Sequence, residues 1–168
     1  MRLGFSLPKH VCLNGKKYKV DLSFQKVMKV TALLRDSGIS EEARVSAGVR
    51  GFSSPLSHTR SKHLSNTDKI ALLNKIFELL VPSANSEAKQ KTKLIFSLEK
   101  DGALIYSAFL QTYGIDLQKD KIDWREFNVL LSCIPENTAL FCVMKSRLAE
   151  PFENIDDGLE TLFEKLIK

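Results

Sequence analysis

The chain of 168 residues and 18.9 kDa has the length of one domain, and its 43% hydrophobic and 27% charged residues exclude disordered and collagen-like proteins. The sequence contains no stretch of about 20 apolar residues, the length that a bilayer-spanning helix needs. Pro8 and Lys9 interrupt the N-terminus before the apolar segment of a signal peptide can form. We therefore expect a cytosolic protein. The net charge of +5 is uneven: residues 1–66 hold 12 basic and 4 acidic side chains, and residues 101–168 hold 7 and 12. Opposite surfaces that neutralise each other within the fold, or between copies, are therefore expected.

A β-hairpin followed by a helix is predicted for the N-terminal region. Asn14-Gly15 separates two short runs in which polar and apolar residues alternate, and this dipeptide favours a type I′ turn because both positions need positive φ. The hairpin is expected over 9–21. A helix capped by Asp21 or Ser23 should run to about Arg35 and end at Gly38. The spacing of apolar residues predicts its buried face as Phe24, Val27, Met28, Thr31 and Leu34.

Residues 37–66 differ from their surroundings. The stretch is rich in serine, carries three glycines and a proline, and shows no sustained apolar period. Such a composition predicts a flexible, basic insertion, with one short helix near Glu41–Val49.

Three helices are predicted next. The first begins near Thr67 and is stopped by Pro82, and a more polar one occupies Ser83–Leu98. The third begins after Asp101, and its apolar residues surround nearly the whole helix axis, which predicts a core helix enclosed by others. Gly114 lies where a left-handed residue would end it. The stripe of the first helix is Ile70, Leu73, Ile76, Phe77 and Leu80.

The remaining chain predicts further helices. Asp123 and Glu126 form a capping-box pattern at the start of one helix, a second follows Thr138, and an acidic amphipathic helix is expected over 155–168. The predicted fold is mainly α: a single domain of about six helices with a small N-terminal β-hairpin and a helical core over 68–150.

No residue pattern favours catalysis or a bound metal. The histidines lack an accompanying Cys-x-x-Cys or His-Glu-x-x-His motif, and the aspartates after residue 115 lack the spacing of an EF-hand loop. Neither a nucleophile with a neighbouring base nor a phosphate-binding loop is present. We therefore expect no enzyme, no metal and no cofactor. The residues considered are His10, His58, His63, Asp116, Asp120, Asp123, Ser107 and Cys133.

Cysteine and basic residues give weaker signals. An odd number of cysteines, Cys12, Cys133 and Cys142, does not form a disulfide framework, and reduced thiols in the core are expected. The basic residues of 1–66 could contact phosphates. They alternate with core positions, however, as on any solvated face, so nucleic-acid binding is the less favoured interpretation.

A succession of short motifs lies between 101 and 147. Tyr113-Gly114-Ile115-Asp116-Leu117 ends one predicted helix, Trp124 and Phe127 begin the next, and Arg147 lies in the last. In this block the chain closely resembles the bacteriophage gp-fifteen family of tailed-phage proteins. The similarity is interpreted as covering about 1–36 and 68–150, with 37–66 and the C-terminal tail as departures. We expect Tyr113, Gly114, Asp116 and Trp124 to be architectural, with Trp124 in the core beside Phe109 and Asp116 capping a turn.

The resemblance implies a non-enzymatic role in tail morphogenesis. Such proteins are regarded as tail assembly chaperones, which bind the tape-measure protein in the host cytoplasm and aid polymerisation of the major tail protein. A homo-oligomer is expected. The alternatives are a minor tail or connector protein retained in the virion and, less favoured, a basic nucleic-acid binder. A C-terminal apolar stripe is either the last piece of the core or an exchangeable interface: Leu159, Leu162, Phe163, Leu166 and Ile167.

Overall fold

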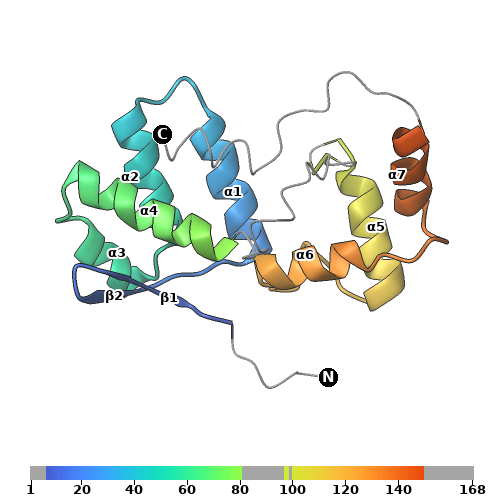
Figure 1. The fold of residues 1–168 in the computed structure, drawn as a ribbon, viewed down its shortest axis with the longest axis horizontal. Coiled ribbons are helices and arrows are strands. Elements are labelled where there is room, and N and C mark those ends of the chain that lie inside the picture. Colours follow the sequence, from blue (N-terminus) through green and yellow to red (C-terminus); the bar gives the residue numbers. More distant parts are fainter. Residues whose placement is uncertain (1–6, 81–96, 99, 150–168) are drawn as a thin grey trace. The chain divides into compact units, whose positions relative to one another are not determined.

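The computed structural model describes residues 7–80, 97–98 and 100–149, and these form seven helices and one two-stranded antiparallel hairpin (Figure 1). The mainly α prediction with an N-terminal hairpin is thereby confirmed. The chain divides into two compact units, 1–82 and 83–168, so the predicted helical core of 68–150 is divided between them. The predicted single domain over 1–168 stays a prediction. The helices expected over 83–98 and 155–168 fall largely or wholly outside the described residues.

The hairpin of the first unit consists of β1 (His10–Leu13) and β2 (Lys16–Lys19). Asn14 and Gly15 have φ of 50° and 73°, as the type I′ turn requires. Val11 pairs with Tyr18, and both side chains are buried, since directly opposite residues of two antiparallel strands lie on the same face. Further hydrogen bonds tie β2 to the chain that follows: Lys19 N–H donates to Ser57 Oγ at 2.7 Å, and the Lys19 carbonyl accepts from Ser54 N–H at 3.0 Å.

The first helix, α1 (Phe24–Arg35), has the predicted bounds, but its predicted buried face is partly wrong: Phe24 and Met28 are only partly buried, and Val30 is buried although it was not predicted. Val27, Val30, Thr31 and Leu34 are its buried residues, and Ser23 is the N-cap. The helix ends before Gly38, because Asp36 adopts an extended conformation as C-cap. Asp36 then accepts a hydrogen bond from Gly38 N–H at 2.9 Å, which forms the turn.

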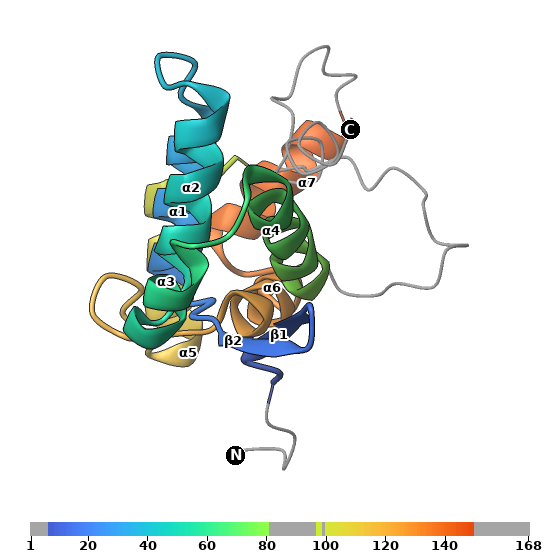
Figure 2. The ribbon, with the colours of Figure 1, turned by 90° about the vertical axis from the view of Figure 1, so that its left-hand side faces the viewer.

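The flexible insertion predicted over 37–66 is wrong in its central part. Residues 41–61 form α2 (Glu41–Phe52) and α3 (Pro55–Ser61), so the single short helix expected near Glu41–Val49 is longer and has a neighbour. Val45, Val49 and Phe52 are buried, and α2 runs beside α1 (Figure 2). Two glycines weaken the apolar period of α2, which explains why the sequence pattern did not indicate a packed helix.

Those glycines allow close contact between α1 and α2. A Cβ at Gly48 would lie 3.2 Å from Leu34 Cδ2, and a Cβ at Gly51 would clash with Val30 Cγ2. Glycine is unfavourable inside a helix by about 1 kcal/mol relative to alanine. The close packing of α1 against α2, which only glycine permits at these positions, therefore outweighs the low helix propensity of glycine.

Gly51→Ala is expected to lower the free energy of unfolding by about 1 kcal/mol, because overpacking costs about 2 kcal/mol and the gain in helix propensity offsets half. Thermal unfolding followed by circular dichroism measures the change. In a Val30→Ala background the clashing methyl groups are gone, so the same substitution should instead raise the free energy of unfolding by about 1 kcal/mol, the gain in helix propensity alone. Equal losses in both backgrounds would contradict the packing explanation.

The core of the first unit is completed by α4 (Asn66–Leu80), as the stripe after Thr67 predicts. Of the predicted stripe, Leu73, Ile76, Phe77 and Leu80 are buried, whereas Ile70 is only partly buried and Leu72, which was not predicted, has no exposed surface. The helix α4 packs against α2. Phe77 meets Phe52 of α2 edge to face, with ring centroids 6.2 Å apart. This aromatic contact lies between two helices of which sequence analysis identified only one as packed.

The second unit contains α5 (Gly102–Tyr113), α6 (Trp124–Ser132) and α7 (Ala139–Ala149). The prediction that α5 is enclosed on all sides is wrong among the described residues. Ile105, Ala108 and Phe109 are buried on one face, while Leu110 is 45% exposed. Likewise, the thiols of Cys12, Cys133 and Cys142 are exposed and unpaired, not in the core.

Candidate functional site

The motif block of 101–147 was predicted to be architectural, and its first feature is the end of α5. Gly114 adopts a left-handed conformation with φ of 67°. Its N–H donates to the Leu110 carbonyl at 3.1 Å, and Ile115 N–H reaches the Phe109 carbonyl at 3.4 Å. This pair of bonds satisfies the last carbonyls of a helix. A side chain at position 114 would be strained whatever space surrounds it.

Tyr113 connects α5 to α6. Its hydroxyl donates a hydrogen bond of 2.8 Å to the Leu130 carbonyl, and its ring meets Phe109 edge to face at 5.6 Å. Burial raises the pKa of Tyr113 above its usual 10.0, and the electrostatic interaction with the nearby Cys133 side chain adds to the rise. The phenol therefore stays protonated, as its donor role requires.

Asp116 organises the turn after α5. Its carboxylate accepts from Gln118 N–H at 3.0 Å and from Lys119 Nζ at 3.1 Å, and its own N–H donates to the Asp120 carboxylate at 2.8 Å. The Lys119 hydrogen bond lowers the pKa of Asp116. The side chain lies in a turn, where the sequence analysis expected it.

Trp124, Phe127 and Phe109 form a buried aromatic cluster. Phe127 stacks on Phe109 with centroids 4.9 Å apart and on Trp124 with centroids 5.5 Å apart. All three side chains are at most 5% exposed. Phe127 therefore contacts both of the other rings and forms the centre of packing between α5 and α6.

Asp123 caps α6 in a different way from the predicted box. Its carboxylate accepts from Arg125 N–H at 3.0 Å and also from the Arg125 guanidinium, at 2.9 Å on each oxygen. The side chain of Arg125 takes part in the cap, which a pattern based on Glu126 did not indicate.

Arg147 of α7 forms a two-pronged ion pair with Asp101, the residue before α5. The two guanidinium nitrogens lie 2.5 and 2.8 Å from the carboxylate oxygens. Asp101 is only 4% exposed and also accepts from Ser97 N–H at 2.7 Å. The Arg147 hydrogen bond is the main cause that holds the pKa of Asp101 below its usual 3.8. No local sequence pattern predicts this pair, because 46 positions separate the two residues.

The six motif residues Tyr113, Gly114, Asp116, Trp124, Phe127 and Arg147 each take part in a helix end, a turn, the aromatic cluster or an ion pair of the second unit. No group of three or more histidine, cysteine or carboxylate side chains in the described ranges could hold a metal ion. Of the histidines, His10 lies on β1 and His58 on α3. No described helix is long and apolar enough to cross a bilayer.

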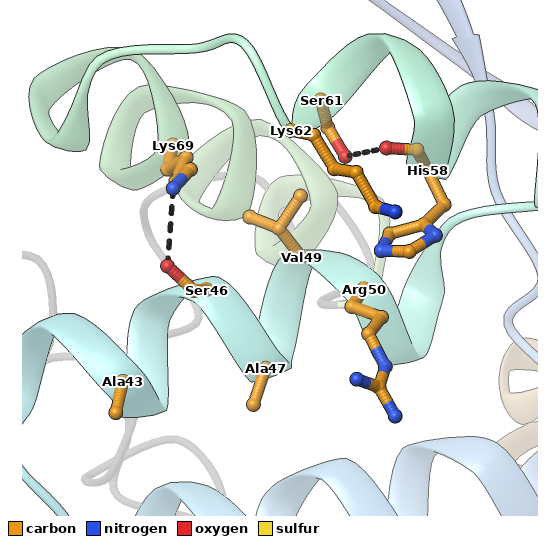
Figure 3. Close-up of a pocket in the computed structure, with 9 residues that line it drawn as sticks. All are labelled: Ala43, Ser46, Ala47, Val49, Arg50, His58, Ser61, Lys62 and Lys69. Carbon is orange, nitrogen blue, oxygen red and sulfur yellow. Dashed lines mark hydrogen bonds between the residues drawn. The ribbon is translucent and has the colours of Figure 1, made fainter.

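A second feature, which sequence analysis did not identify, is a pocket of about 400 Å³ in the first unit (Figure 3). Small side chains of α2 contribute part of its wall, and four basic or titratable side chains from α2, α3 and α4 surround it. At one side Lys69 Nζ donates to Ser46 Oγ at 3.1 Å. The lining residues are Ala43, Ser46, Ala47, Val49, Arg50, His58, Ser61, Lys62 and Lys69.

Residues 5–166 match the sequence model of the family described as Bacteriophage Gp15 protein. The chain belongs to the bacteriophage Gp15 protein family. The expected resemblance is confirmed, and this Gp15 protein matches its family over nearly the whole chain. No curated protein and no solved structure matches it.

The extent of the match corrects one expectation. Residues 37–66 and the C-terminal stretch were interpreted as departures from the family, but the match runs from 5 to 166 and spans both. The helices α2 and α3, and with them the pocket, thus lie within the family-matched region. The predicted interface residues Leu159, Leu162, Phe163, Leu166 and Ile167 lie outside the described residues.

Proposed function

We propose that this Gp15 family protein is a tail assembly chaperone, which binds the tape-measure protein in the host cytoplasm and aids polymerisation of the major tail protein. Family membership over residues 5–166 carries the proposal. The protein acts through binding surfaces and self-association, without a cofactor. A structural role in the virion, as a minor tail or connector protein, is the second candidate.

Exposed apolar side chains of the second unit support a client-binding role. Leu110 of α5 is 45% exposed and Val129 of α6 is 62% exposed. Isolated apolar side chains are common on protein surfaces. A chaperone needs such side chains, because it must cover apolar stretches of its client and later release them.

Co-expression with the tape-measure protein of the same phage tests the proposal. We expect this Gp15 protein to keep the tape measure soluble and to co-purify with it, while purified virions contain no stoichiometric copies by mass spectrometry. Abundant copies in mature particles would favour the virion component and contradict the chaperone role.

A matched pair of variants tests the surface. Leu110→Asp places a charge at the exposed apolar position and is expected to lower recovery of soluble tape measure several-fold. Ser107→Asp adds the same charge at another exposed position of α5 and should leave recovery unchanged. Equal recovery with both variants would show that the client binds another surface.

A further inference from the structure

The pocket of the first unit gathers positive charge without any negative charge in its lining. Arg50 of α2, His58 and Lys62 at α3, and Lys69 of α4 all line it, and none of the nine lining residues is acidic. Lys69 is held by Ser46. Within the part of the chain that the structure describes, neither Arg50 nor Lys62 forms an ion pair. A concave site with unneutralised cations attracts anionic groups.

The wall of the pocket is apolar as well as basic. Ala43 and Ala47 lie one turn apart on α2, and Val49, also in the lining, is 1% exposed. Figure 3 shows Arg50, His58 and Lys62 together at one end of this wall and Lys69 towards the other. Small side chains allow a partner helix to approach closely, and the cations of the wall attract a helix that carries carboxylates beside its apolar stripe.

The chain itself contains a segment of that chemistry. The last described helix ends at Ala149, and residues 150–168 carry six acidic and two basic side chains. In the helix that their pattern predicts, Glu160 and Glu164 lie one turn apart along one side of the apolar stripe of Leu159, Leu162, Phe163, Leu166 and Ile167. The family match includes this segment up to residue 166.

We propose that the pocket between α2, α3 and α4 binds the acidic C-terminal segment, residues 150–168, of a second copy of this chain. The proposal rests on the self-association included in the proposed function and names the surfaces that perform it. Because the two surfaces differ, the contact is head to tail and can repeat from copy to copy. A repeating contact suits a protein that coats a long client.

Two charge-reversed full-length chains test the proposal. Arg50→Glu with Lys62→Glu reverses the pocket, and Glu160→Lys with Glu164→Lys reverses the segment. Light scattering and sedimentation should show wild-type assemblies, while each reversed chain alone should show at least a tenfold weaker association. An equimolar mixture of the two should recover assembly, because pocket and segment are complementary again in both pairings.

The matched control is Lys29→Glu with Arg60→Glu, which reverses two exposed charges outside the pocket and should leave assembly unchanged. Circular dichroism of every variant shows that the fold is retained. A monomeric wild type, an unchanged mass in both reversed chains, or a mixture that fails to assemble would overturn the proposal. So would a shift of duplex DNA that the pocket reversal abolishes while the assembly mass stays constant.

These outcomes are separable from those of the chaperone proposal. Recovery of soluble tape measure is measured on the same variants. A pocket-reversed chain that stays monomeric and still solubilises the tape measure supports the head-to-tail contact. A chain that assembles as expected but never binds the tape measure leaves the head-to-tail contact standing and contradicts the proposed function.

Discussion

Phe127→Ala is expected to lower the free energy of unfolding of the second unit by about 4 kcal/mol, the cost of emptying a large aromatic site in a core. Phe127 has no exposed surface and stacks on both Phe109 and Trp124. Two aromatic contacts are lost together with the buried area, and the rings on either side cannot close the gap without leaving each other. Urea unfolding measures the loss.

Trp124 makes this measurement specific. It is the only tryptophan of the chain and is 5% exposed, so the red shift of its fluorescence reports unfolding of the unit that contains the cluster. Val129→Ala is the matched control, because Val129 lies on the same helix and is 62% exposed. It should change stability by less than about 0.5 kcal/mol. Similar losses for both variants would show that Phe127 is not the centre of this core.

Arg147→Met is expected to cost about 2 kcal/mol at neutral pH, because it leaves the carboxylate of Asp101 buried without its cation. The figure is below that of a fully buried pair because the Arg147 side chain is 26% exposed. Adding Asp101→Asn to this variant removes the unpaired charge and should restore part of the stability. Arg147→Lys should be intermediate, since an ammonium group cannot make the two-pronged contact.

The stability that the Asp101–Arg147 pair contributes should fall at acidic pH. The pKa of Asp101 is lower in the folded chain than its usual 3.8. Its stabilising contribution is therefore fully present above 3.8 and is lost as the pH falls through the folded-state pKa. The difference between wild type and Arg147→Met should narrow when unfolding is measured at about pH 3.

Lys119→Met serves as the control for the ion pair. Lys119 also bonds an aspartate, Asp116, at 3.1 Å, but its side chain is 84% exposed. Exposed pairs contribute little, so the variant should unfold at the same urea concentration as wild type. A loss as large as that of Arg147→Met would contradict the importance assigned to burial.

The two helices over 41–61 could not be predicted as packed helices from the sequence. Val45, Val49 and Phe52 have helical spacing, but the glycines at 48 and 51 reduce both the apolar signal and the helix propensity of the segment. These glycines are favourable only in the folded chain, where they leave room for Leu34 and Val30 of α1 opposite them. The basic pocket was missed for the same reason, since its walls come from helices that a flexible insertion does not contain.

The sequence by itself determined the local elements and the family. Asn14-Gly15 predicted the hairpin turn, the stripe from Ile70 to Leu80 predicted α4, and Gly114 predicted the end of α5, because turn chemistry and apolar period act between near neighbours in the chain. The motif block of 101–147 indicated the Gp15 family.

Tertiary structure alone decided which of these elements meet and what their exposed faces carry. It brought Asp101 to Arg147 and placed Phe127 between two aromatic rings. In the first unit it gathered Arg50, His58, Lys62 and Lys69 around one cavity. Such contacts join residues far apart in sequence, and no local pattern encodes them, because they depend on the complementarity of whole surfaces.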